Sequence, residues 1–319
     1  MAGDRHGRGA PGAQFSRPIE GASAGQGASA GQDASAGQDA SAGQDGRPVQ
    51  AGPVRRWKDD DPRTAVVRDV LGAVISGLVA EMGRGRLDIV DAGGGTGGFA
   101  VPLAGLGHTV TVVDPSPDSL AAAQRRAAEI AVPLQAIQGD VTDLPGLIGE
   151  QGADLVLCHS VLEYVDVPAA AMAAISRVLR PGGAVSVLAA SAVAAVVHRA
   201  LAGRFDEARR LLAGISAGTA AQDESVAAAP PDGLEGAASE QHAGRPRRFT
   251  LAEVVGLIDA AGLRPGAAHG VRVFADLVPG MLADADPGAA EALLALERAA
   301  SAHPAFHDLA TQFHVLGYR

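Results

Sequence analysis

The chain has 319 residues, of which 47% are hydrophobic, 19% are charged and only 3% are aromatic. Its formal net charge of −10 argues against non-specific coating of nucleic acid, although a local basic site for one RNA stays possible. A lone cysteine, Cys158, excludes disulfide frameworks and multi-cysteine zinc sites, and neither a transmembrane run nor a signal peptide is found, so we expect a cytoplasmic protein without metal or membrane.

Residues 1–52 are predicted to be a disordered tail of low complexity. Positions 21–44 are four tandem hexapeptides, GASAGQ twice and then DASAGQ twice, without any Leu, Ile, Val or aromatic residue. Such a segment buries too little apolar surface to offset the entropy that it loses on ordering. A solvated tail is therefore favoured over a partner-binding one, and the folded domain is expected to span residues 53–319.

After this tail, helical and strand patterns alternate. Apolar residues at helical spacing predict a first helix that ends at Gly83. Strands are predicted in the segments 86–91, 109–114, 134–140, 153–160 and 183–190. Helices are predicted between them over 102–107, 116–131 and 168–183. This alternation predicts an α/β fold, a Rossmann-like, seven-stranded, mostly parallel sheet with helices on both faces.

The C-terminal third is predicted to complete the same sheet. A helical stretch with a break at Gly203 leads into residues 216–246, a polar segment interpreted as a flexible insertion or lid. Thr250 and Glu253 form a capping box at the start of the next helix. The remaining elements are a strand within 266–278, a helix over 291–302 and a last strand over 311–319.

The segment DAGGGTG, residues 91–97, carries the clearest chemical signal. Asp91 ends the first predicted strand, Gly93, Gly94 and Gly95 follow, and the second strand ends in Asp114. A glycine-rich turn at a strand's carboxyl end lets a ligand approach the backbone, and an acid on the next strand can bind ribose hydroxyls. A tight turn that binds no ligand is the alternative.

The charge of Asp91 discriminates between nucleotide ligands. A carboxylate directly before the glycines would repel a pyrophosphate, but it would attract a cationic or amino-bearing ligand. S-adenosylmethionine has both a sulfonium and an α-amino group, so the pattern favours adenosylmethionine over NAD.

From about Pro62 to Arg319 the chain resembles class I S-adenosylmethionine-dependent methyltransferases. More narrowly, it is similar to the bacterial tRNA 5-carboxymethoxyuridine methyltransferase type. The wider resemblance is carried by DAGGGTG, by VVD ending in Asp114, by GDVTDL at 139–144 and by LRPGG at 179–183. The narrower one is carried by HSVLEY at 159–164, AGRFD at 202–206, GVRVF at 270–274, LLALE at 293–297 and FHV at 313–315.

The resemblance implies a role for each matching residue. Gly93, Gly94 and Gly95 would line the methionine end of the cofactor, Asp91 would support its amino group, and Asp114 would take the ribose hydroxyls. The adenine would meet the side chain of Asp140 and the backbone of Val141. His159 would face the transferred methyl group as cofactor ligand and candidate catalytic residue, and Arg63 or Arg68 would meet the cofactor's carboxylate. Thr311 and Gln312 stand where closer relatives have an Arg-Tyr pair, and Leu277 replaces an aromatic residue.

The expected reaction is in-line methyl transfer to an oxygen. A carboxylate acceptor, such as one on a modified wobble uridine of tRNA, needs no general base, whereas an amine or hydroxyl needs one, for which His159 and Glu163 are candidates. The chain has no Asn-Pro-Pro-Tyr-like segment for amino methylation, which favours oxygen. The alternatives are a small-molecule or natural-product methyltransferase on the same core and a non-catalytic adenosylmethionine- or nucleotide-binding protein.

Arginines are the candidates for binding an anionic acceptor. They cluster at positions 199, 204, 209 and 210 and again at 245, 247 and 248, which predicts either a solvated face or an anion-binding cap. Arg272, in a predicted apolar strand, needs an anionic partner, either the substrate or an internal acid such as Asp276. We expect Arg272, Arg199 and Arg204 to bind the acceptor.

Two other groups of residues are given structural roles. Cys158 lies in an apolar strand and is interpreted as a buried thiol. His303 and His307 are four residues apart, but Pro304 stands between them and a carboxylate partner is missing, so a partly exposed pair at a helix end is favoured over a metal site.

Overall fold

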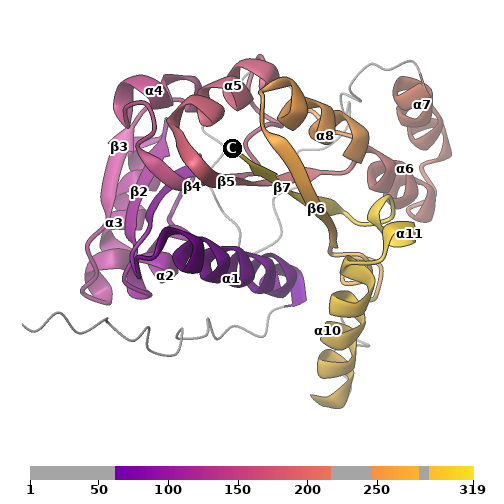
Figure 1. The fold of residues 1–319 in the computed structure, drawn as a ribbon. Helices are drawn as coiled ribbons and strands as arrows, with labels where there is room; N and C mark the ends of the chain where they lie inside the picture. The colour runs from indigo at the N-terminus through magenta and orange to yellow at the C-terminus, as the bar shows by residue number, and fades with distance from the viewer. Residues whose placement is uncertain (1–61, 217–245, 280–286) are drawn as a thin grey trace, which may run out of the picture. The chain divides into compact units, whose positions relative to one another are not determined.

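The computed structural model describes residues 62–216, 246–279 and 287–319 (Figure 1). The predicted tail, residues 1–52, and almost all of the predicted lid, residues 216–246, lie outside the described residues. The chain divides into Met1–Val49 and Gln50–Arg319, and every described residue belongs to the second unit.

Seven strands form one sheet, as the alternating pattern predicted. In spatial order they are β3 (Gln135–Gln138), β2 (Thr109–Asp114), β1 (Asp88–Ala92), β4 (Ala153–His159), β5 (Leu179–Ala190), β7 (Gln312–Tyr318) and β6 (Arg264–Val271). All neighbouring pairs are parallel except those of β7, which runs antiparallel to both β5 and β6. The last strand of the chain is therefore inserted between β5 and β6.

Helices cover both faces of this sheet (Figure 1). On one face lie α1 (Pro62–Met82), α2 (Ala100–Gly105) and α3 (Pro117–Glu129), and on the other lie α4 (Leu144–Leu147), α5 (Pro168–Val178) and α8 (Leu251–Ala260). The remaining helical elements are η1 (Val141–Asp143), α6 (Ala192–Leu201), α7 (Phe205–Ser216), α10 (Pro287–Ser301) and α11 (Pro304–His307). None of the described helices combines the length and apolar character needed to cross a membrane.

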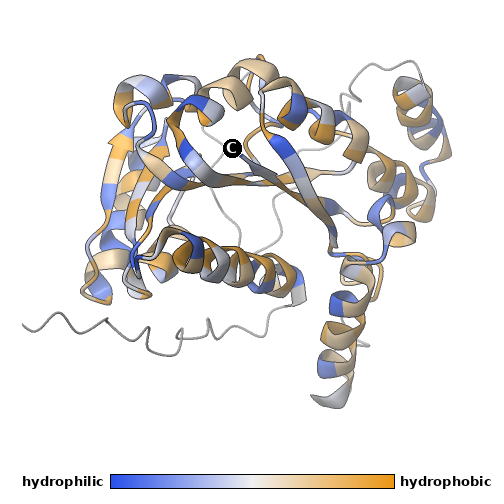
Figure 2. Ribbon diagram, viewed as in Figure 1, coloured by the Kyte–Doolittle hydropathy of each residue, from blue (hydrophilic) through white to orange (hydrophobic). Residues whose placement is uncertain are grey.

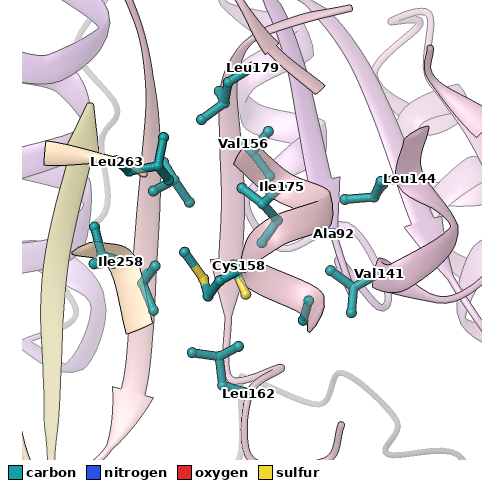
Figure 3. Packing of buried hydrophobic residues seen from close by; sticks show 14 of the residues in the cluster. Ala92, Val141, Leu144, Val156, Cys158, Leu162, Ile175, Leu179, Ile258 and Leu263 are labelled. Carbon is teal, nitrogen blue, oxygen red and sulfur yellow. The ribbon is translucent and has the colours of Figure 1, made fainter. Parts of the chain in front are cut away.

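Alternation along the buried strands divides the core into two layers. In β4, Leu155 and Leu157 join the cluster under α1, whereas Val156 and Cys158 join the cluster under α5 and α8 (Figure 3). Helix α1, which covers the first of these clusters, is predominantly hydrophobic (Figure 2). Cys158 is fully buried, which confirms its interpretation as a core thiol, and burial raises the pKa of that thiol.

Local signals at helix ends behave as expected. The Ser116 side chain accepts a hydrogen bond from Ser119 N at the start of α3, and Thr250 and Glu253 form the predicted capping box on α8. Gly203, with φ +74°, separates α6 from α7. These are interactions between residues that are close in the sequence, so the sequence pattern alone can predict them.

Three boundaries differ from the predictions. Helix α5 ends at Val178 because Leu179 is already extended, so residues 181 and 182 belong to β5 rather than to a helix end. Residues 141–147, given no helix from the sequence, form η1 and α4. Strand β6 ends at Val271, so Arg272 follows the strand instead of lying within it, and its φ of +60° turns the chain away.

A buried carboxylate joins the amino ends of three central strands. Asp154 in β4 is fully buried, and it accepts hydrogen bonds from Asp88 N at 2.7 Å and from Arg180 Nη1 at 2.7 Å. Arg84 forms an ion pair with the same carboxylate. Strands β1, β4 and β5 are thereby connected at the end of the sheet opposite to the glycine turn.

Replacing this carboxylate is expected to destabilise the fold. Asp154→Ala should lower the free energy of unfolding by about 2–3 kcal/mol, because it removes a fully buried carboxylate together with its hydrogen bonds to Asp88 N and Arg180 and its ion pair with Arg84. Urea denaturation followed by circular dichroism measures this loss. Glu150→Ala is the matched control, since it removes an exposed ion pair with Arg177 and should leave the denaturation midpoint unchanged. Equal effects of the two variants would contradict the role of Asp154.

Candidate functional site

The glycine turn after β1 has a backbone that glycine adopts without strain. Gly93, Gly95 and Gly97 have φ values of +68°, +52° and +81°, which are unfavourable for residues with a side chain. Gly93 N donates a hydrogen bond to Val113 O at 2.7 Å, which ties the turn to the end of β2. The turn therefore lies at the carboxyl ends of two adjoining parallel strands, where ligands bind in such sheets.

Asp114, at the end of β2, is oriented by the same turn. Its Oδ2 accepts a hydrogen bond from Gly95 N and its Oδ1 accepts one from Ser116 N, both at 2.9 Å. The residue is 5% exposed, and burial raises its pKa although both hydrogen bonds lower it. Each oxygen of a carboxylate has two lone pairs, so each Asp114 oxygen keeps one acceptor position for a ligand.

Asp91 is the second buried acid at this edge. It is 3% exposed, and burial together with the nearby charge of Asp114 raises its pKa to about 7, although a hydrogen bond from the backbone of Ala100 lowers it. Its carboxyl group lies against Gly94, where a Cβ would come within 2.5 Å of Asp91 Cγ. Gly94 is therefore required by the position of Asp91 as well as by any ligand.

Asp140 and Val141 follow β3 at the same edge of the sheet. Asp140 Oδ1 accepts hydrogen bonds from Thr142 N and Thr142 Oγ1, both at 3.0 Å, and Asp143 accepts one from Asp140 N. These bonds form a capping box on η1 that the sequence analysis missed. The side chain of Val141 is buried. Asp140 thus has a local structural role in addition to the adenine contact that the resemblance implies.

His159 ends β4 and lies against the helix that follows the glycine turn. Its ring is edge-on to Phe99, with 4.8 Å between the ring centroids, and its Nε2 is 2.7 Å from Ser186 Oγ. Burial lowers the pKa of His159 to about 3, so the ring is neutral at physiological pH. An imidazole with so low a pKa is a weak general base.

Of the two candidate bases, Glu163 has the pKa closer to neutral. It is 6% exposed, its Oε1 accepts a hydrogen bond from Ala190 N at 2.7 Å, and burial raises its pKa to about 7. Its Oε2 is buried and has no hydrogen-bond partner among the described residues. A carboxyl group that titrates near neutral pH can accept or release a proton.

Arg272 has an internal partner, which is the alternative that the sequence left open. Its Nη2 lies 2.6 Å from Asp276 Oδ2, and both side chains are nearly buried, with 10% and 11% exposure. Arg63, one candidate for the cofactor's carboxylate, also points to Asp276, at 4.0 Å. The Nε of Arg272 is buried and has no hydrogen-bond partner among the described residues. Pairing with Asp276 through Nη2 therefore leaves the Nε donor of Arg272 available.

The conformation of Arg272 is maintained by a residue that sequence reasoning did not single out. The carboxylate of Glu297, on α10, is fully buried and accepts hydrogen bonds from the backbone N–H groups of Val273, Phe274 and Ala275 at 2.6–2.9 Å. These bonds fix the turn that follows β6. The only sequence signal for this contact was that GVRVF and LLALE both contribute to the narrower resemblance.

Arginines of the first predicted cluster form ion pairs with nearby acids. Arg199 and Arg204 form ion pairs with Glu207, at 3.1 and 3.8 Å, and Arg209 pairs with Asp206 on an exposed surface of α7. Burial is the main cause of the lowered pKa of His198; the charges of Arg248, Arg272 and Arg199 lower that pKa further, and the charge of Asp276 raises it. The anion-binding cap stays a prediction.

The remaining predicted residues lie elsewhere. His303 is exposed and accepts a hydrogen bond from Ala305 N, whereas His307 is buried, with its Nε2 3.1 Å from Ser301 O, so the expectation of a partly exposed pair was wrong for His307. Gln312 donates to Ser160 Oγ at 3.2 Å, beside the carboxyl end of β4. Within the described ranges, no group of three or more His, Cys, Asp or Glu side chains is placed to hold a metal ion.

The part of the chain that contains the glycine turn is similar in sequence to known proteins. Residues 90–187 match the family described as "Methyltransferase domain". The tRNA 5-carboxymethoxyuridine methyltransferase of Escherichia coli (strain K12) is 36% identical over 131 residues, which cover 40% of this chain and 50% of that protein. The ubiquinone biosynthesis O-methyltransferase of Methylobacterium nodulans is 41% identical over 98 residues, 30% of this chain and 38% of that protein.

The matched region covers only part of this chain and only part of each relative. The chain spans about half the length of the E. coli relative, and less of the M. nodulans one. Among solved structures, magnesium protoporphyrin IX methyltransferase from Synechocystis PCC 6803 has 16% identity and a TM-score of 0.47, with 81% of this chain and 85% of that chain covered. Residues 90–187 are therefore similar in sequence to a methyltransferase domain, and they lie within a seven-stranded sheet of the kind that the resemblance to class I enzymes predicted.

Proposed function

We propose that this protein transfers a methyl group from S-adenosylmethionine to an oxygen atom of an anionic acceptor. The observation that carries this proposal is the pair of buried carboxylates, Asp91 and Asp114, on either side of the glycine turn. Two buried acids suit a ligand that offers both a positive charge and hydroxyl groups, and they oppose a pyrophosphate.

The residues at this edge fit adenosylmethionine. Asp114 has one free acceptor position on each oxygen, which matches the two hydroxyls of a ribose. Asp91 would accept hydrogen bonds from the amino group, and the glycines would allow the methionine end to approach the backbone. Asp140 and Val141 would contact the adenine, as the resemblance implies.

The chemistry of transfer asks little of the protein besides alignment. Bound adenosylmethionine supplies a methyl group already activated by its sulfonium. His159, with its neutral ring edge-on to Phe99, would shape the space near that methyl group rather than remove a proton. An ionised carboxylate acceptor needs no base, and for a hydroxyl acceptor Glu163 is better suited than His159.

An anionic acceptor is supported by the arginines beyond β5 and β6. The unpartnered Nε of Arg272 could donate to a carboxylate, because the Asp276 pair occupies only one end of the guanidinium. Arg199 would add positive charge near His198, and Arg204, just before α7, has a half-exposed side chain that pairs with Glu207. We therefore propose a carboxylate on a modified tRNA uridine as acceptor, in line with the E. coli relative, and a small-molecule acid as the second candidate.

The proposal is tested in two steps. Calorimetry should detect binding of adenosylmethionine and adenosylhomocysteine but not of NAD. Radiolabelled adenosylmethionine should then transfer its methyl group to bulk bacterial tRNA, and base-labile label in the RNA would identify a methyl ester. Label that enters only a small-molecule extract would select the second candidate, and failure of adenosylmethionine to bind would contradict the proposal as a whole.

Affinity for the cofactor is expected to depend on pH through Asp91. The free carboxyl has a pKa of about 7, and a bound ammonium group would favour its ionised form. Adenosylhomocysteine should therefore bind more tightly as pH rises through 7, and its affinity should fall by up to about tenfold per unit below that.

Calorimetry between pH 5.5 and 8.5 measures this dependence. Asp91→Asn should flatten it, whereas Asp118→Asn, at an exposed position on α3, should leave it as in the wild type. Affinity that does not change with pH in the wild-type protein would show that Asp91 does not contact the amino group.

Arg272→Met is expected to affect the acceptor and not the cofactor. The variant keeps most of the side-chain volume and removes the charge, so the acceptor's KM should rise by about tenfold, as for one lost charged hydrogen bond. Adenosylmethionine affinity should stay nearly constant. Arg209→Met, on the exposed face of α7, is the control and should behave as wild type. Joint loss of cofactor binding and thermal stability in Arg272→Met would instead identify the Asp276 pair as purely structural.

A further inference from the structure

The sheet face that α1 covers contains a row of imidazole rings in an otherwise apolar layer. His159 in β4, Leu188 in β5, His314 in β7 and His269 in β6 are register partners across four strands. Their neighbours in this layer are aliphatic, including Leu155, Leu157 and Leu188 itself. Polar rings buried among such side chains need hydrogen bonds to offset the water that they lose.

One serine supplies these bonds for two of the rings. Ser186, two residues before Leu188 and therefore on the same face of β5, places its Oγ 2.7 Å from His159 Nε2 and 2.5 Å from His314 Nε2. Ser186 and His314 are fully buried. The two rings are perpendicular, with 5.9 Å between their centroids. The serine hydroxyl thus bridges rings that come from strands separated by more than 150 residues in the sequence.

The chemistry of this bridge restricts the protons on both rings. Burial lowers the pKa of His159 and that of His314, so each ring is neutral and has a single N–H. The hydroxyl has one hydrogen, and its side-chain hydrogen-bond partners among the described residues are these two Nε2 atoms, so it donates that hydrogen to one of them. The other Nε2 must then donate its own hydrogen to Oγ. One ring is therefore protonated on Nε2 and the other on Nδ1.

We propose that Ser186 and His314 are positioning residues for His159, and that the bridging hydroxyl forces the two imidazoles into opposite tautomers. The bridge holds Nε2 of the His159 ring, while Phe99, from the segment after the glycine turn, packs edge-on against the ring. His314, through Ser186, then determines whether Nδ1 of His159 presents a lone pair or an N–H group. That His159 borders the transferred methyl group rests on the proposed function; the tautomer coupling does not.

The third ring of the row provides a natural control. His269 lies next to His314, with 6.0 Å between ring centroids, and makes no hydrogen bond to it among the described residues. His269 lines a cavity of about 580 Å³ between α1, β7 and α10, whose lining does not include His159, Ser186 or His314. Removing its imidazole alters the same layer without breaking the serine bridge.

The first test measures tautomers directly in the cofactor-free wild-type protein. Long-range proton–nitrogen NMR correlations distinguish Nδ1–H from Nε2–H rings, and His159→Gln and His314→Gln spectra assign the signals. We expect one ring of each tautomer. Two rings with the same tautomer would overturn the proposal whether or not the protein is a methyltransferase.

The second test asks whether the bridge matters at the site. Ser186→Ala should abolish the tautomer pairing and lower kcat of methyl transfer by about threefold to tenfold, as expected for loss of one buried hydrogen bond. Ser186→Thr, which keeps the hydroxyl, should restore most of both. His269→Gln should leave the tautomers of His159 and His314 unchanged. An alanine variant that folds with wild-type kcat and KM would show that the bridge has no positioning role.

Discussion

The burial of two carboxylates at one edge of the sheet is the constraint on which the site depends. Asp91 and Asp114 lie at the carboxyl ends of adjacent parallel strands, and Gly95 N, in the glycine turn between them, donates a hydrogen bond to Asp114. Burial and mutual repulsion keep the pKa of Asp91 near 7, so in the absence of a ligand this edge is electrostatically unfavourable. A cationic ligand relieves that cost, and the free energy released contributes to binding.

At the opposite end of the same strands, a buried acid is paired with groups of the protein itself. There the buried Asp154 is compensated by Arg84, Arg180 and the backbone of Asp88. One end of the sheet is thus stabilised by acids with full partners, and the other retains acids with acceptor positions to spare. A structural cluster differs from a candidate binding site in whether the hydrogen-bonding positions of its acids are already used, and not in the presence of acids.

A similar distinction applies to the residues on the acceptor side. Glu297 uses its carboxylate entirely on the turn after β6, and Arg272, which that turn orients, has one donor paired with Asp276 and another unpaired. Arg209, which pairs with Asp206, and Arg204, which pairs with Glu207, have exposed side chains. Position relative to the strand ends, and not the number of arginines, decides which of them can serve an anionic acceptor.

The sequence by itself determined the alternating fold, the glycine turn with Asp91 and Asp114, and the caps at Ser116 and Thr250, because each depends on residues that are near in the chain or on the regular order of parallel strands. It could not determine the partner of Arg272, the contact of Glu297 with residues 273–275, or the bridge from His159 through Ser186 to His314. Those contacts arise only when β7 inserts antiparallel between β5 and β6 and α10 packs against the turn after β6. Side-chain pairing across distant strands depends on register and on burial, and local periodicity carries no information about either.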